Sequence, residues 1–138
     1  NSCYGGFSLS KEACQRYWEI KGKQVWIEDD TQFKTMGLFT VWLIPPEDRL
    51  ESKEGEEFYK LSREDRIAYN KQHSEQTWYC RNVDRSDPAL VQLVEEMGES
   101  AGGRCAELKV VEIPADVEWE IEEYDGAEWI AEKHRTWE

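Results

Sequence analysis

Three glutamates near the carboxyl end of the chain alternate with other residues: Glu118, Glu120 and Glu122. On an extended strand such residues share one face and lie about 7 Å apart. A carboxylate row could bind a divalent cation, hydrolyse a glycoside, or imitate the regularly spaced phosphates of a nucleic acid. Calcium and magnesium sites usually take ligands from loops and several elements, so the pattern favours a solvated acidic face over a metal site.

A β-hairpin is the element that must position this row. Asp125 and Gly126 form a favoured two-residue turn, so counting outward pairs Tyr124 with Ala127, Glu122 with Trp129 and Ile121 with Ile130. One face, expected on the core side, then carries Val117, Trp119, Ile121 and Ile130. The outward face carries Glu118, Glu120, Glu122, Tyr124, Trp129 and Ala131.

Aromatic side chains beside the carboxylates add the anchors that protein interfaces favour. The outward face is therefore predicted to bind a partner through five residues: Glu118, Glu120, Glu122, Tyr124 and Trp129.

The net charge narrows the kind of partner. It is −13 at pH 7, and the segment from Glu112 to Glu138 holds ten acidic residues against Lys133 and Arg135, which leaves −8 there. Such a surface disfavours direct contact with nucleic acid or an anionic membrane. It suits a basic protein or a cation, although solubility alone also explains an acidic surface. No metal site or cofactor is predicted.

The residues that usually carry catalysis or hold metals give little signal. Cys3, Cys14, Cys80 and Cys105 have no C-x-x-C spacing, which argues against structural zinc. We expect four reduced thiols, with Cys3, Cys14 and Cys105 buried beside apolar neighbours. The two histidines lie in no recognisable nucleophile signature. No catalytic residue is predicted, and the chain is expected not to be an enzyme.

A second candidate site lies at the start of the chain. Tyr4, Gly5, Gly6, Phe7 and Ser8 precede a helix whose start is marked by Ser10. Backbone N–H groups at a helix start can bind an anion, so a small nucleotide or phosphate ligand is an alternative hypothesis. No P-loop lysine motif follows. The favoured interpretation is structural, in which the two glycines form a tight entry to the helix.

The remaining pattern predicts an α+β fold in one domain over 1–138. Helices are expected from Lys11 to about Lys21 and from Pro88 to Gly98, and they pack together. Strands are expected at 24–28, 37–44, 77–80 and 105–113, in an antiparallel or mixed sheet ended by the C-terminal β-hairpin, and 37–44 is expected to be covered on both faces. Residues 47–76 form a charged helical insertion on the surface, with a helix capped by Ser62 and Ile67 on its inner face. No apolar run approaches 18 residues, so no transmembrane helix is expected.

Four blocks of sequence resemble a family of small uncharacterised proteins from bacteriophages and other viruses of microbes. They are CYGGFSLS at 3–10, DPALVQLVEEMG at 87–98, VEIPADVEWEIEEYDG at 111–126 and EKHRTW at 132–137. The resemblance brings no established activity. It implies a phage protein, for which the expected reduced thiols favour the host cytoplasm, and it supports treating 47–76 as an insertion, because members often have a shorter segment there.

In a phage setting, the acidic face predicts a non-enzymatic interaction protein. Its expected role is an anti-defence or host-takeover inhibitor that binds a basic host protein or a nucleic-acid-binding complex. The alternatives are a protein that binds or sequesters a small anionic ligand such as a nucleotide, and a virion or assembly protein. An edge hairpin could also pair between copies, so a homo-oligomer remains open.

Overall fold

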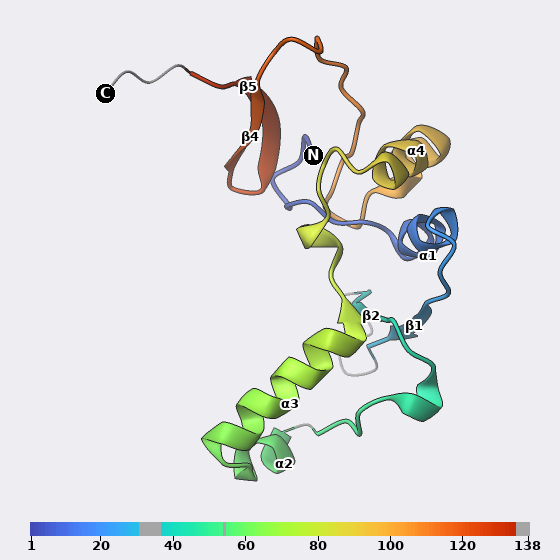
Figure 1. Cartoon of the computed structure of the whole chain (residues 1–138), viewed down its shortest axis with the longest axis vertical. Helices are drawn as coiled ribbons and strands as arrows, with labels where there is room; N and C mark the ends of the chain where they lie inside the picture. Colours follow the sequence, from blue (N-terminus) through green and yellow to red (C-terminus); the bar gives the residue numbers. More distant parts are fainter. Residues whose placement is uncertain (31–36, 54, 135–138) are drawn as a thin grey trace. The chain divides into compact units, whose positions relative to one another are not determined.

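A computed structural model describes residues 1–30, 37–53 and 55–134. The chain divides into two compact units, of which the first comprises Asn1–Lys21 with Cys80–Glu138 and the second Gly22–Tyr79 (Figure 1). The second unit contains the whole predicted insertion over 47–76 and also the strands ahead of it. The two units are distinguished by their internal contacts, which do not test whether the chain folds as one domain. The single domain over 1–138 stays a prediction. The last block of the family resemblance ends outside the described residues, which stop at 134.

Two helices form one layer of the first unit. Helix α1 spans Lys11–Ile20, and the Ser10 hydroxyl oxygen accepts a hydrogen bond from Ala13 N–H at its start. Helix α4 spans Pro88–Met97, where the Asp87 carboxylate accepts from Ala89 N–H. These caps satisfy N–H groups that a helix start otherwise leaves unpaired. Both predicted helices are confirmed, and Figure 1 shows them side by side.

The core of the first unit lies between these helices. Leu93 and Ala13 are fully buried, Cys14 is 1% exposed, and Leu90 and Val94 are also buried. Leu93 of α4 is the largest fully buried side chain of this core.

The C-terminal hairpin follows the predicted register. Strand β4 spans Trp119–Tyr124 and β5 spans Ala127–Glu132. They are antiparallel, with Tyr124 opposite Ala127, Glu122 opposite Trp129 and Ile121 opposite Ile130. Asp125 and Gly126 both have positive φ, 50° and 88°. This is the combination that a type I′ turn requires and that Asp-Gly adopts readily.

Two expectations around the hairpin are wrong. Residues 105–113 form no strand: the chain from 107 to 114 is irregular, and Val110 and Val111 are exposed. Here the neighbouring chain is the short segment Asn1–Ser2, which offers one backbone hydrogen bond, from Ser2 N–H to Glu107 O, and no ladder. The inner face of the hairpin is also less covered than expected, since Ile121 is 37% exposed.

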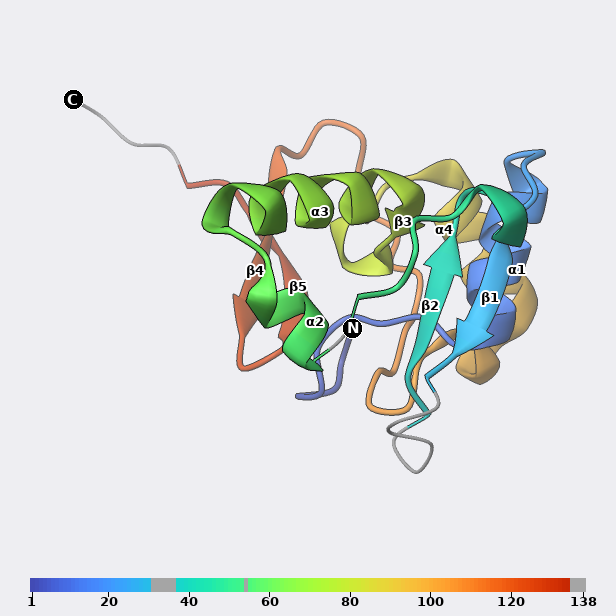
Figure 2. The same cartoon turned by 90° about the horizontal axis from the view of Figure 1, so that it is seen from below.

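The second unit contains a small antiparallel sheet in the order β1-β2-β3. Strand β1 spans Trp26–Asp29, β2 spans Phe39–Trp42 and β3 spans Thr77–Trp78, and Figure 2 shows β1 beside β2. The expectation that 37–44 is covered on both faces is wrong. Only Val41 of β2 is buried, and Leu38 is 47% exposed. Strands of two to four residues form too small a sheet to bury both faces.

Two helices complete the second unit: α2 spans Gly55–Lys60 and α3 spans Arg63–Gln76. The predicted Ser62 cap is confirmed by its bond from Asp65 N–H at 3.0 Å. Ile67 does not face inward as expected, because it is 59% exposed. The inner side of α3 instead carries Tyr69 and His73, whose rings stack at 6.4 Å between centroids. That aromatic pair occupies the face that the sequence assigned to Ile67.

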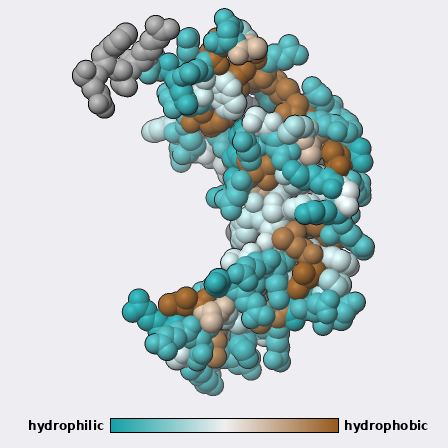
Figure 3. Space-filling model, in the orientation of Figure 1, coloured by the Kyte–Doolittle hydropathy of each residue, from teal (hydrophilic) through white to brown (hydrophobic). Residues whose placement is uncertain are grey.

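Short 3-10 helices occupy Pro46–Asp48, Cys80–Asn82 and Gly98–Ala101. The α+β class is confirmed by the four α-helices and two antiparallel sheets of the described chain. None of the helices within 1–30, 37–53 and 55–134 is both long and apolar enough to cross a membrane. Hydrophilic residues dominate the visible surface, and hydrophobic residues lie there in separate patches (Figure 3).

Candidate partner-binding site

The hairpin presents the five predicted binding residues on one face. Glu118, Glu120 and Glu122 are exposed, and the Tyr124 and Trp129 side chains are 70% and 46% exposed. They share a face because strand side chains alternate and because Glu122 lies opposite Trp129. The structure therefore brings together the residues that the spacing predicted would meet.

A cross-strand hydrogen bond orders the centre of this face. Trp129 Nε1 donates to Glu122 Oε2 at 3.0 Å. The bond fixes the orientation of an exposed indole ring. A rigid, half-exposed aromatic ring beside a carboxylate is a favourable anchor, because little conformational entropy is lost when a partner contacts it.

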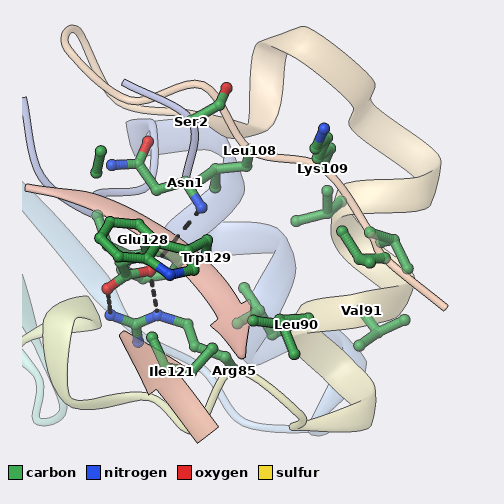
Figure 4. A pocket seen from close by; sticks show the side chains of 16 residues that line it. Asn1, Ser2, Arg85, Leu90, Val91, Leu108, Lys109, Ile121, Glu128 and Trp129 are labelled. Atoms are coloured by element: carbon green, nitrogen blue, oxygen red, sulfur yellow. Dashed lines mark hydrogen bonds and ion pairs between the residues drawn. The ribbon is translucent and has the colours of Figure 1, made fainter. Parts of the chain in front are cut away.

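One hairpin acid is not available to a partner. Glu128 Oε1 and Oε2 accept from Arg85 Nη2 and Nε at 2.7 and 3.0 Å, a bidentate pair drawn in Figure 4. Only 12% of the Glu128 side chain and 21% of the Arg85 side chain is exposed. Parallel N–H···O bonds of this kind are strong and directional. The pair therefore fixes the inner face of the hairpin to the turn that precedes α4.

Arg85 also contacts the beginning of the chain. Its guanidinium lies 3.6 Å from the centre of the Phe7 ring, and Nη1 donates to the Val83 and Arg81 carbonyl oxygens. One side chain thus joins the N-terminal segment, the turn at 81–85 and β5. Sequence reasoning did not identify Arg85, because 43 residues separate it from Glu128 and no local pattern links them.

An apolar groove of about 550 Å³ lies against the inner side of the hairpin. Leu90 and Val91 of α4 point toward it in Figure 4, and the extended segment 108–111 and β5 line it on other sides. Ligand pockets typically measure about 300–1,000 Å³. Sequence reasoning did not predict this groove, because it depends on an irregular segment that was expected to be a strand.

The glycines of the alternative ligand site have a packing role. A Cβ on Gly5 would lie 2.1 Å from the Cys105 carbonyl oxygen, and a Cβ on Gly126 would lie 2.5 Å from Gly6 N. The N-terminal segment therefore passes between Cys105 and the hairpin turn at a separation that only glycine permits. This supports the structural interpretation of Gly5 and Gly6.

The other residues of that alternative site have different environments. Phe7 is 6% exposed beneath Arg85, while Tyr4 is 69% exposed. Ser8 contributes its carbonyl oxygen to a bond from Gly103 N–H. Ligand binding by Tyr4, Gly5, Gly6, Phe7 and Ser8 stays a prediction.

The four cysteines are free thiols. Cys14 is buried as expected, but Cys3 is only half-buried, and Cys105 is exposed where the predicted strand does not form. Cys14 and Cys80 interact with each other. A side-chain hydrogen bond with Cys14 and a weaker effect of one with the Leu9 backbone lower the pKa of the Cys80 thiol to about 6, against the opposing effect of burial. The same bond and burial raise the pKa of Cys14.

Within the described residues, no cluster of three or more His, Cys, Asp or Glu side chains is arranged to hold a metal ion.

No protein-family model, curated protein or solved structure matches the chain. The resemblance to small phage and viral proteins therefore stays a prediction from the sequence blocks. The features of this chain that indicate a function are therefore those of its surface, namely an ordered acidic face with two exposed aromatic rings next to an apolar groove.

Proposed function

We propose that this chain is a non-enzymatic interaction protein whose outward hairpin face binds a basic surface of a partner protein. The observation that carries the proposal is the arrangement of Glu118, Glu120 and Glu122 in one exposed row beside the Tyr124 and Trp129 rings. A row of like charges on a structured strand costs repulsion, which a basic partner would relieve.

The partner most compatible with this face is a host protein or complex that normally binds nucleic acid. Carboxylates about 7 Å apart on a strand offer repeated negative charge to a groove lined by lysine and arginine. The resemblance of the sequence blocks to phage proteins supports a role for this interaction in a phage-infected host cell, as an anti-defence or host-takeover inhibitor. Nucleotide sequestration and a role in virion assembly are the competing proposals.

The test is affinity capture from a microbial host lysate with three forms of the protein. The first is the unmodified chain, and the second carries Glu118→Gln, Glu120→Gln and Glu122→Gln. The third is a control with the same change in net charge, Glu47→Gln, Glu51→Gln and Glu57→Gln, at exposed positions of the second unit.

We expect the hairpin triple variant to lose its main partner and the control to keep it. Binding should weaken by at least about tenfold between 0.1 and 1 M salt, because the Debye length falls from about 10 to 3 Å. Equal capture by the two triple variants would exclude the acidic face as the binding site. Thermal stabilisation by one nucleotide, unaffected by the hairpin triple variant, would favour the ligand-binding alternative instead.

A further inference from the structure

Trp129 and Glu122 form a hydrogen-bonded pair on the outward face of the hairpin. Trp129 Nε1 donates to Glu122 Oε2 at 3.0 Å between directly opposed positions of β4 and β5. The Trp129 side chain is 46% exposed, and Glu122 is exposed as well. Among the described residues, no lysine or arginine forms an ion pair with Glu122 or stacks on the Trp129 ring.

The second unit contains the same kind of pair with an arginine bound to it. Trp42 Nε1 donates to Glu28 Oε2 at 3.0 Å, here between diagonal positions of β2 and β1. The Arg49 guanidinium lies 4.7 Å from the centre of the Trp42 ring, and its Nη1 donates to the same Glu28 oxygen at 2.8 Å. Only 14% of the Arg49 side chain is exposed, although Glu28 is 60% exposed. An indole bonded to a carboxylate thus holds an arginine within this chain.

A second arginine of the chain is bound by a ring and a carboxylate together. The Arg85 guanidinium lies 3.6 Å from the centre of the Phe7 ring while its Nη2 and Nε donate to Glu128. A guanidinium can do both at once because it is planar: its face stacks on the ring and its edge donates to the carboxylate. Trp129 and Glu122 offer the same two surfaces at an exposed position.

Lysine suits such a pair less well than arginine. Lys21 pairs with Asp87 at 2.6 Å, but its ammonium lies 5.0 Å from the centre of the neighbouring tyrosine ring, further than either arginine from its own ring. An ammonium is compact and strongly hydrated, so it gains less from an exposed ring than a guanidinium does. The Trp129 ring therefore favours arginine.

The neighbours of Trp129 on the outward face leave space and charge for this side chain. Ala131 follows on the same face, opposite Glu120, and its methyl group leaves room for an aliphatic stem beside the ring. Glu120 supplies a second carboxylate, about 7 Å from Glu122 along β4. Among the described residues of β5 and its extension, the one cation on this face is Lys133, about 13 Å from Trp129 along the strand. The Trp129 end of the face thus keeps its negative charge.

We propose that Trp129 and Glu122 bind one arginine side chain of the partner protein. Its guanidinium would stack on the indole ring and donate to the Glu122 carboxylate, as Arg49 does on Trp42 and Glu28. This inference rests on the proposed function, because it specifies which residue a basic partner places on the acidic face.

The probes are two capped peptides of equal length and charge, in which three arginines or three lysines alternate with glycine. Each is titrated into the intact protein near neutral pH and followed by NMR at the Trp129 indole N–H and the Ala131 amide. We expect the arginine peptide to bind with a dissociation constant on the order of 1 mM. The lysine peptide should bind at least about threefold more weakly, because it lacks most of the stacking on the ring. Equal dissociation constants, or no shift at either resonance up to about 10 mM peptide, would overturn the assignment.

A protein variant tests the ring itself. Trp129→Leu should weaken binding of the arginine peptide by at least about threefold and remove the difference between the two peptides. Tyr59→Leu removes an exposed ring of the second unit, 74% exposed, and is the matched control that should keep the difference. Circular dichroism and the amide resonances of β4 and β5 show whether Trp129→Leu remains folded. If it does not, the comparison of the two peptides on the unmodified protein decides the question.

A second variant separates this inference from the proposed function. Glu118→Gln with Glu120→Gln weakens the carboxylate row and leaves Trp129 and Glu122 in place. If it weakens both peptides equally while Trp129→Leu changes neither, the acidic row binds and the arginine site is wrong. If it changes neither peptide while Trp129→Leu removes the preference for arginine, the arginine site stands and the proposal of a binding row fails. Both are supported if the double variant weakens both peptides and Trp129→Leu removes the preference.

Discussion

The helix layer and the hairpin region of the first unit differ in how completely they cover their apolar residues. Between α1 and α4, Leu93 is fully buried and Leu90 is 4% exposed. On the inner face of the hairpin, Ile121 is 37% exposed and Ile130 is only half-buried. The apolar stripes of the helices pack against each other, whereas the inner side of the hairpin faces a groove. The chain thus closes one layer with its own side chains and leaves the other partly exposed.

The same contrast applies to the polar contacts. In the helix layer, Arg16 and Glu96 form an ion pair at 2.8 Å, but their side chains are 40% and 39% exposed. In the hairpin region, the Arg85–Glu128 pair is much less exposed. Exposed pairs usually contribute little to stability, whereas covered ones are costly to break. The hairpin therefore depends on polar attachment in the way that the helix layer depends on apolar packing.

The largest difference in stability should appear when one apolar side chain in each region is shortened to alanine. We expect Leu93→Ala to lower the free energy of unfolding by about 3 kcal/mol, because it leaves a cavity in a closed core. Ile130→Ala removes a half-buried side chain beside the groove and should cost about 1 kcal/mol. Urea denaturation followed by circular dichroism measures both. Equal losses would mean that the hairpin is packed as tightly as the helices, and the contrast would be wrong.

Breaking the two ion pairs should give a smaller but still unequal effect. Arg85→Ala leaves Glu128 largely covered without its bidentate guanidinium, with the Asn1 ammonium 3.9 Å away, and should destabilise the protein by about 2–3 kcal/mol. Arg16→Ala should cost less than about 1 kcal/mol. A double-mutant cycle with Glu128→Gln isolates the coupling in the first pair, and one with Glu96→Gln isolates it in the second. A coupling energy at Arg85–Glu128 no larger than at Arg16–Glu96 would contradict the proposed attachment of the hairpin.

The parts that the sequence predicted correctly are set by neighbours along the chain. Ser10, Asp87 and Ser62 mark helix starts because their side chains bond N–H groups two or three residues later. The hairpin register follows from Asp125 and Gly126, because a two-residue turn leaves one way to pair the flanking strands. The outward face could therefore be predicted residue by residue before any packing was known.

The parts that failed depend on contacts between distant residues. The alternation around Leu108 and Val110 predicts a strand, but a strand needs a neighbour, and Asn1–Ser2 supplies only a short one. Arg85 attaches Glu128 across 43 residues, and no spacing rule indicates which of many acids it selects. The groove results from both failures together, because it lies between the segment that did not become a strand and the strand that Arg85 holds.

The smallest expected effect is on the reactivity of Cys80, which tests how well the edge of the helix layer is shielded from solvent. Cys80 lies beside the buried Cys14, whose hydrogen bond is the main cause that lowers the pKa of Cys80 to about 6. The thiolate is the nucleophile, so in a Cys3→Ser, Cys105→Ser background the alkylation rate of Cys80 by iodoacetamide should reach half its plateau near pH 6. An ordinary thiol reaches this point near a pH of about 8.5.

Cys14→Ala identifies the cause of that midpoint. It removes the hydrogen-bond donor and should move the midpoint upward toward the ordinary value, with little change in the plateau rate. Cys14→Ser retains a donor and should keep the midpoint low, so it controls for the loss of the sulfur atom. If the midpoint stays near pH 6 in Cys14→Ala, the thiol pair is not the cause. If Cys80 does not react at any pH, this edge of the helix layer is as closed as its centre, and the contrast with the hairpin extends to the whole layer.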